Sequence, residues 1–314
     1  MAVDRPGAGV QLRGDRLVGV ARRGGRLCRG LRGWGPVRTP AGGAAWPGTG
    51  VAGMGGRGRG GSIGNPGGLH TLIRIGYDIE LAVATPMALI YLLRVPPSRR
   101  DDLVAPENVL LSAGLVGEEY IDGFGNLCGR VNVPVGMPTV RITNDAVIRD
   151  PGELDVFDAD ARQHDPTELP VSTLQFLLPS RYCEVDSELL AFAWDRFGGT
   201  PLGWPRVRAI CDFVHQHIRF NYKTARPTRT ALDGFREKEG VCRDFTHLAI
   251  TLCRCMNIPA RYTTGYLGDI GVPYAGRMDF SAWCEVFLGD RWYTSDASHN
   301  TRRIGRITQA SGRN

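Results

Sequence analysis

Hydrophobic and polar residues alternate in short segments from residue 72 to about residue 150, and this period of two predicts β-strands. The predicted strands cover residues 72–83, 87–95, 108–111, 118–121, 127–133 and 139–148. An Asp-Gly-Phe-Gly-Asn turn at residues 122–126 separates two of them, and its glycines can take the positive φ angles that a hairpin needs. Residues 71–150 are therefore predicted to form a small antiparallel β-sandwich domain.

The second half of the chain changes from this pattern to a helical one. Helical periodicity covers residues 187–197 and 205–218, and residues 230–239 lead into a further helical run at 247–256. Predicted strands follow at residues 260–267, 280–288 and 291–296. Helices first and strands after predict an α+β domain over residues 171–314.

Two segments stand out by composition. Residues 1–70 hold 22 of the 42 glycines and 11 arginines against two aspartates, without a helical or strand period, and are predicted to be a disordered N-terminal tail. The tail contributes +9 to the formal net charge of +6, so the remaining residues carry −3. Residues 151–170 include six acidic residues and no apolar period, which is typical of an interdomain linker.

The composition also limits the expected partners. The Arg/Gly-rich tail could bind RNA through phosphate contacts, but only Trp34 and Trp46 could stack on bases, so we favour an extension without function and expect no nucleic acid partner. The longest apolar run, residues 81–93, is short of the roughly 20 residues of a membrane helix. With no secretory signal, we expect a cytoplasmic protein without a membrane partner. The sequence leaves the oligomeric state open.

The eight cysteines are scattered along the chain, as is typical of proteins from a reducing compartment. No Cys-x-x-Cys pair occurs, and we expect neither a metal site nor a cofactor. Cys284 has odd spacing from Ser281, which predicts that the two lie on opposite faces of one strand. Four cysteines are predicted to be small core residues, namely Cys128, Cys211, Cys253 and Cys255.

Cys242 differs from these, because Gly-Val-Cys-Arg-Asp-Phe at residues 240–245 places it where a polar loop gives way to a helix. Unpaired N–H groups and the helix dipole at such a position favour the thiolate. The sequence therefore predicts a nucleophile at Cys242.

Four segments resemble the bacterial transglutaminase-like family, which has a papain-like core: residues 240–248, 258–266, 282–287 and 291–296. The resemblance implies a Cys–His–Asp triad, with Cys242 as nucleophile and Asp296 as the carboxylate that orients the base. The family's His-Ala-Trp reads Ser281-Ala282-Trp283 here. A hydroxyl cannot take a thiol proton near neutral pH, so Ser281 does not replace the histidine.

Four histidines are candidates for a substitute base. His299 follows Asp296 by three residues and is the tentative base, although an exposed loop histidine is the simpler interpretation. His247 lies five residues after Cys242 on the same helix, so their side chains point apart. His215 and His217 belong to the preceding helix and are interpreted as structural.

The sequence thus predicts an enzyme that cleaves or transfers the acyl group of a glutamine side-chain amide or a peptide bond through a thioester on Cys242. A protease or amidase acting on a peptide or protein substrate is favoured over a crosslinking enzyme. The alternative is a non-catalytic binding module in which Ser281 has replaced the triad histidine. Family members usually continue beyond the polar end of this chain, and we expect the closing strand of the sheet to be missing.

Overall fold

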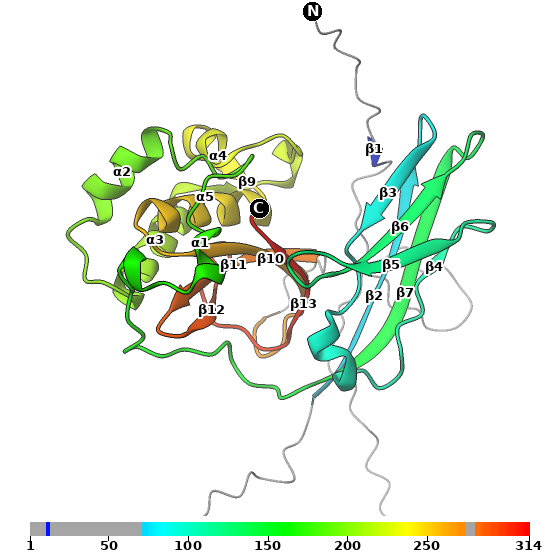
Figure 1. Cartoon of the computed structure of the whole chain (residues 1–314), viewed down its shortest axis with the longest axis horizontal. Coiled ribbons are helices and arrows are strands. Elements are labelled where there is room, and N and C mark those ends of the chain that lie inside the picture. Colours follow the sequence, from blue (N-terminus) through cyan, green and yellow to red (C-terminus); the bar gives the residue numbers. More distant parts are fainter. Residues whose placement is uncertain (1–10, 13–70, 274–279) are drawn as a thin grey trace, which may run out of the picture.

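The computed structural model describes residues 11–12, 71–273 and 280–314. Apart from β1 (Gln11–Leu12), which pairs with β2, the predicted disordered tail lies outside the described residues. The described part forms a β-rich domain followed by a mixed helical and strand domain (Figure 1). The fold class is therefore α+β, as predicted.

Two antiparallel sheets form the β-rich domain. One has the order β1-β2-β7-β4 and the other β3-β6-β5. The bounds are β2 (Thr71–Ala82), β3 (Met87–Tyr91), β4 (Leu110–Leu111), β5 (Gly117–Ile121), β6 (Leu127–Val133) and β7 (Thr139–Asp150), with a 3-10 helix η1 (Pro97–Asp102). Burial alternates along β7, so that Val140, Ile142 and Ile148 point inward. Tyr77 of β2 and Val131 of β6 belong to one core cluster, which joins the two sheets face to face.

Five helices and two short strands open the second domain in the described residues. They are α1 (Val171–Leu174), α2 (Glu188–Phe197), α3 (Trp204–His217), β8 (Arg219–Phe220), α4 (Ala231–Glu237), β9 (Glu239–Gly240) and α5 (Cys242–Cys255), with η2 (Pro166–Glu168) and η3 (Tyr222–Thr224). Helix α5 is central: every residue from Asp244 to Cys255 is buried. The other helices and the sheet cover it from several sides, so its first residue is held in a fixed position (Figure 1).

The sheet of this domain has the order β12-β11-β10-β13. Its strands are β10 (Ala260–Leu267), β11 (Phe280–Leu288), β12 (Arg291–Ser295) and β13 (Arg306–Gly312). The expectation that the polar end of the chain lacks a closing strand is wrong, because β13 pairs antiparallel with β10. Ile307 and Gln309 of β13 are buried, and the Gln309 side-chain amide donates to the Leu93 carbonyl across the domain boundary. A hydrogen-bonded glutamine thus occupies a core position that a hydrophobic pattern does not predict.

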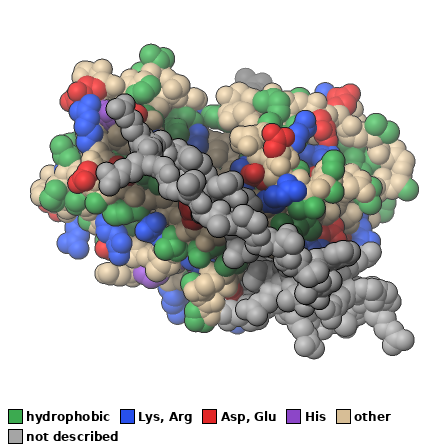
Figure 2. Space-filling model, turned by 90° about the horizontal axis from the view of Figure 1, so that it is seen from below, with side chains coloured by type: hydrophobic (Ala, Val, Ile, Leu, Met, Phe, Trp, Pro, Cys, Tyr) green, Lys and Arg blue, Asp and Glu red, His purple; other side chains and the backbone are tan. Residues whose placement is uncertain are grey.

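The acidic segment 151–170 is fixed against the second domain. Leu154 forms an antiparallel bridge with Ile304, and Ala161, His164 and Leu169 are buried. Side chains of both signs are interspersed on the face of the molecule in Figure 2. Outside the tail, that face therefore offers no broad basic surface in the described residues.

Candidate active site

Cys242 is the first residue of α5, five positions earlier than the predicted helical run began. Val241 before it is extended, and Asp244 accepts a hydrogen bond of 2.8 Å from the Val241 N–H. This closes the first turn of the helix in the manner of an N-terminal cap. A Cβ atom at Gly240 would lie 2.6 Å from Cβ of Asp244, so glycine is required at this position. The sequence therefore fixes the sulfur at the start of the helix.

A buried ion-pair network holds this turn. The Asp244 side chain is 0% exposed and accepts from Nη1 of Arg229 at 3.0 Å, and Arg229 is 2% exposed. Arg229 also pairs with Glu237 of α4 at 3.0 Å. Asp244 and Arg229 were not predicted, although an acidic residue three positions after a helix cap is a known signal. They fix α4 against the start of α5.

The pKa of the Cys242 thiol is higher than the position of the residue at a helix N-terminus alone predicts. The residue is partly exposed, but desolvation by the surrounding protein raises the pKa of its thiol to about 11. Hydrogen bonding from the backbone of Ala282 and Arg243 lowers the pKa, and the negative charge of Asp296 raises it. Burial therefore acts against the thiolate that the start of a helix favours. A base must remove the proton as the sulfur attacks.

Ser281 and Asp296 lie on the sheet beside α5. Ser281 is the second residue of β11, pairs with Gly265 of β10 and is 9% exposed. Asp296 directly follows β12 and is 7% exposed. The backbone of Ala282 contacts the sulfur of Cys242, and the charge of Asp296 acts on the same thiol. The structure therefore brings together the start of α5, the start of β11 and the residue after β12.

His299 is hydrogen-bonded to Asp296. Its Nδ1 lies 3.0 Å from Oδ2 of Asp296, and its side chain is 38% exposed. Oδ1 of the same carboxylate accepts from the Ser298 N–H at 2.9 Å and from the His299 N–H at 3.1 Å. Nη2 of Arg306 donates to Oδ2 at 2.9 Å. Burial acts to raise the pKa of Asp296, but His299 and Arg306 together hold it below its ordinary value, so the carboxylate is ionised.

The other described histidines have structural contacts. His247 is 1% exposed, its ring is stacked on Tyr182 with centroids 5.2 Å apart, and burial lowers its pKa to about 3. His215 contacts the Ala297 carbonyl and His217 the Phe235 carbonyl. These three histidines therefore have the structural roles that were predicted.

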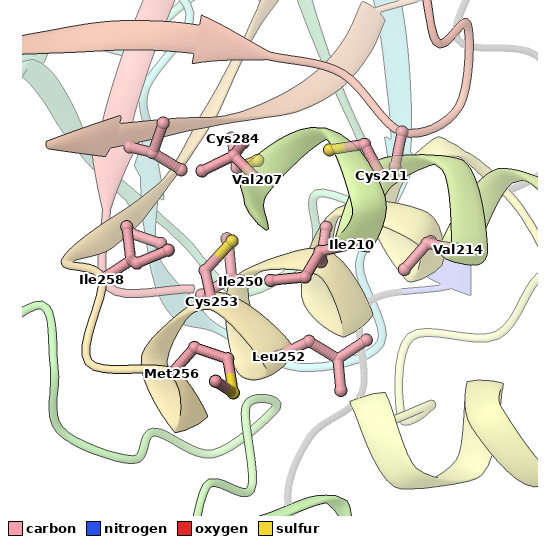
Figure 3. Packing of buried hydrophobic residues seen from close by; sticks show 14 of the residues in the cluster. Val207, Ile210, Cys211, Val214, Ile250, Leu252, Cys253, Met256, Ile258 and Cys284 are labelled. Atoms are coloured by element: carbon pink, nitrogen blue, oxygen red, sulfur yellow. The ribbon is translucent and has the colours of Figure 1, made fainter. Parts of the chain in front are cut away.

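The remaining cysteines of the second domain are core residues. Figure 3 shows Cys211 of α3, Cys253 of α5 and Cys284 of β11 among aliphatic side chains. The Cys284 thiol donates to the Ser295 carbonyl at 3.1 Å, and Cys211 lies 3.0 Å from the Ser295 hydroxyl. Glu285, whose role the sequence left open, forms an ion pair of 2.6 Å with Arg261. Cys242 alone among the seven described cysteines is not buried.

Within residues 11–12, 71–273 and 280–314, no group of three or more His, Cys, Asp or Glu side chains has the arrangement of a metal site. In the same part of the chain, no helix combines the length and apolar character needed to cross a membrane.

A half-buried cysteine that begins a central helix, packed against an antiparallel sheet with a buried carboxylate just after one of its strands, is the arrangement found in papain-like thiol enzymes. Residues 194–297 match the family described as the transglutaminase-like superfamily. The chain therefore contains a transglutaminase-like core. Asp296 lies just inside the end of the matched segment, and His299 and Arg306 lie beyond it.

One solved structure is similar over most of the chain, the structure of a "putative cysteine protease" from Cytophaga hutchinsonii. It is 26% identical with a TM-score of 0.65, and the match covers 78% of this chain and 82% of that one. An uncharacterized protein of Mycobacterium leprae is 24% identical over 183 residues, 55% of this chain and 63% of the relative. One of Mycobacterium tuberculosis is 29% identical over 186 residues, 53% and 56%. The matches thus span less than two thirds of these curated relatives.

Proposed function

We propose that this chain is a cysteine hydrolase that cleaves a glutamine side-chain amide or a peptide bond through a thioester on Cys242. One observation carries the proposal: Oδ2 of Asp296 lies 3.0 Å from Nδ1 of His299, and the negative charge of the same Asp296 acts on the Cys242 thiol. A carboxylate bonded to Nδ1 orients an imidazole and stabilises its protonated form, as in catalytic triads. His299 would then do from the loop after β12 what the family's histidine does from β11.

The reaction would proceed in two halves. Sγ of Cys242 attacks the amide carbonyl carbon as its proton passes to Nε2 of His299, and the negative charge moves to the carbonyl oxygen. Backbone N–H groups at the start of α5, including that of Cys242, would bind this oxyanion. The C–N bond breaks as His299 returns the proton to the leaving ammonia or amine. Water then attacks the thioester with His299 as base, which releases the acid and the free thiol.

Several features support hydrolysis of a peptide or protein substrate. The core belongs to a class of thiol enzymes, and the solved relative is described as a protease. Water can accept the acyl group from the thioester without the binding of a second substrate. The free, scattered thiols favour a reducing compartment such as the cytoplasm.

Replacing His299 with glutamine tests the proposed base. We expect His299→Gln to lower kcat by about 10²–10⁴, because the proton acceptor is removed while the fold is kept. The matched control is His217→Gln, since His217 is likewise a hydrogen-bonded histidine, but its partner is the Phe235 carbonyl and it lies on α3. Ammonia release and peptide cleavage measure the two activities, and equal kcat values for His299→Gln and wild type would exclude His299 as the base.

The second candidate function is a binding module without catalysis, and two observations favour it. Ser281 occupies the position of the family's histidine, and burial raises the pKa of Cys242 to about 11. We expect the alkylation rate of Cys242 to be half-maximal near pH 11, whereas the rate for a free thiol is half-maximal near its pKa of about 8.5. Ser281→His should add a cation beside the sulfur and move this rise toward neutral pH.

Mass spectrometry of the alkylated protein measures that shift at Cys242 separately from the other cysteines. An unchanged pH profile in Ser281→His would contradict the placement of Ser281 next to the sulfur. Turnover by wild type would exclude the binding-module function.

A further inference from the structure

Arg306, the first residue of β13, joins two carboxylates at the edge of the candidate site. Its Nη2 donates to Oδ2 of Asp296 at 2.9 Å, and its Nε donates to the two oxygens of Asp155 at 3.0 and 2.9 Å. The guanidinium lies 4.9 Å from the ring centroid of Trp283 on β11. The Arg306 side chain is 6% exposed, so these contacts are shielded from water.

Asp155 belongs to the segment that leaves the β-rich domain. Its N–H donates to the Arg303 carbonyl at 2.8 Å, and its Oδ2 accepts from the Arg303 N–H at 2.9 Å. Leu154 next to it forms the bridge with Ile304. The position of the Asp155 carboxylate is therefore set by backbone pairing between the interdomain segment and the residues just before β13.

We propose that Arg306 is a positioning residue that fixes the Asp296 carboxylate for His299, and that Asp155 positions Arg306 in turn. The inference rests on the proposed function, and extends the active site to the segment that joins the two domains. Arg306 contacts no reacting atom in this assignment. It acts through Asp296, whose Oδ2 it shares with Nδ1 of His299.

The guanidinium suits this role better than an ammonium group would. Its planar fork can present Nε to Asp155 and Nη2 to Asp296 at the same time, while the face of the plane lies against Trp283. A lysine ammonium on its flexible chain would place one point charge and fix neither carboxylate plane. Arg306→Lys should therefore keep the charge and lose the orientation.

The ionised state of Asp296 depends on the groups around it. The charged and titratable groups that face it are His299 on its own loop, Arg306 on β13 with Asp155 behind it, Cys242 on α5, Cys211 on α3 and Cys284 on β11. Arg306 is the only arginine that contacts Asp296 among the described residues, and burial opposes ionisation. Removing the guanidinium should raise the pKa of Asp296.

The pKa of Asp296 determines how the stability of the protein depends on pH. In the wild type the pKa of Asp296 is lowered, so its contribution to stability is present above about pH 4 and is lost as the pH falls. In Arg306→Gln the buried Asp296 carboxylate lacks its guanidinium partner at pH 7, and protonation of Asp296 removes the unfavourable buried charge. The stability deficit of Arg306→Gln relative to wild type should therefore shrink as the pH falls, whereas a packing defect would cost the same at every pH.

The experiment compares Arg306→Gln, Arg306→Lys and Asp155→Asn with wild type, in the full chain. Arg261→Gln is the matched control, because it breaks the 2.6 Å Arg261–Glu285 ion pair on the same sheet. We expect Arg306→Gln to lower kcat about tenfold with KM unchanged and to move the acid limb of the kcat profile to higher pH. Asp155→Asn should lower kcat without that shift, because it removes a negative charge beside Arg306 and leaves the guanidinium on Asp296. Arg306→Lys should lower kcat while leaving the acid limb near that of wild type.

Urea unfolding as a function of pH supplies a readout that needs no activity. A pH-independent stability deficit in Arg306→Gln, or an acid limb of that variant equal to that of wild type, would overturn the assignment of Arg306. If Arg306→Gln does not fold, Arg306→Lys and Asp155→Asn decide the question, because kcat values equal to wild type in both would overturn the assignment. Failure of the proposed function has a different signature, namely full turnover by Cys242→Ala or none by wild type.

Discussion

Replacing Cys242 with alanine is expected to reduce amide hydrolysis by a factor on the order of 10⁴ or more, because no other described group can form the thioester. The six other described cysteines are buried, so none can reach a substrate in place of Cys242. Helix α5 should keep its structure, since the first turn is held by Asp244 and alanine is a good helix former. Initial rates of ammonia release and peptide cleavage measure the effect.

The matched control is Cys128→Ala, which removes a buried thiol from β6 in the other domain. It should cost some stability and leave kcat unchanged. Residual activity of Cys242→Ala near the wild-type level would rule out covalent catalysis at this residue. A small residual rate is consistent with catalysis by oxyanion binding and orientation alone.

Replacing Asp244 with alanine is expected to lower the free energy of unfolding by about 3 kcal/mol, the low end of the range for removing one partner of a buried ion pair, because Arg229 keeps its pair with Glu237. Asp244 and Arg229 are 0% and 2% exposed, so water cannot compensate Arg229. The Val241 N–H loses its acceptor at the same time. Chemical denaturation measures the change, and activity should fall because the start of α5 is released.

Two further variants separate these contributions. Asp244→Asn keeps an acceptor for Val241 and removes the charge, so it should cost less than Asp244→Ala. Arg219→Ala breaks the exposed Arg219–Glu239 pair, in which the arginine side chain is 73% exposed, and should change stability by about 0–1 kcal/mol. Equal effects of Asp244→Ala and Arg219→Ala would contradict the structural role of the buried pair.

Periodicity predicted the elements that bury one face. The strands β6 (Leu127–Val133), β10 (Ala260–Leu267) and β11 (Phe280–Leu288) have the predicted bounds, because each has a continuous pattern that ends at a turn or cap. β13 was missed since its core position at 309 holds a glutamine, whose burial depends on a carbonyl in the other domain. A local window contains no information about such a partner.

The candidate site was predictable where a residue's role follows from its local segment. Cys242 and Asp296 were predicted from the segments around them, and the tentative base His299 is hydrogen-bonded to Asp296 in the structure. The state of the thiol was not predictable, because desolvation comes from elements far away in the sequence. The contacts of Arg306 could not be predicted from the sequence, since its two carboxylate partners lie 10 and 151 residues away along the chain.

Gly240 has a consequence for how this sequence can diverge. The position excludes a side chain because of crowding, since a Cβ atom would meet Cβ of Asp244 at 2.6 Å and its Oδ2 at 2.7 Å. Any homologue that keeps the aspartate should therefore keep glycine four residues before it. Where the aspartate has been lost, the crowding disappears with it, and larger residues become tolerable at the glycine position. Substitutions at these two sites should consequently arise in that order during evolution, with the aspartate changing first.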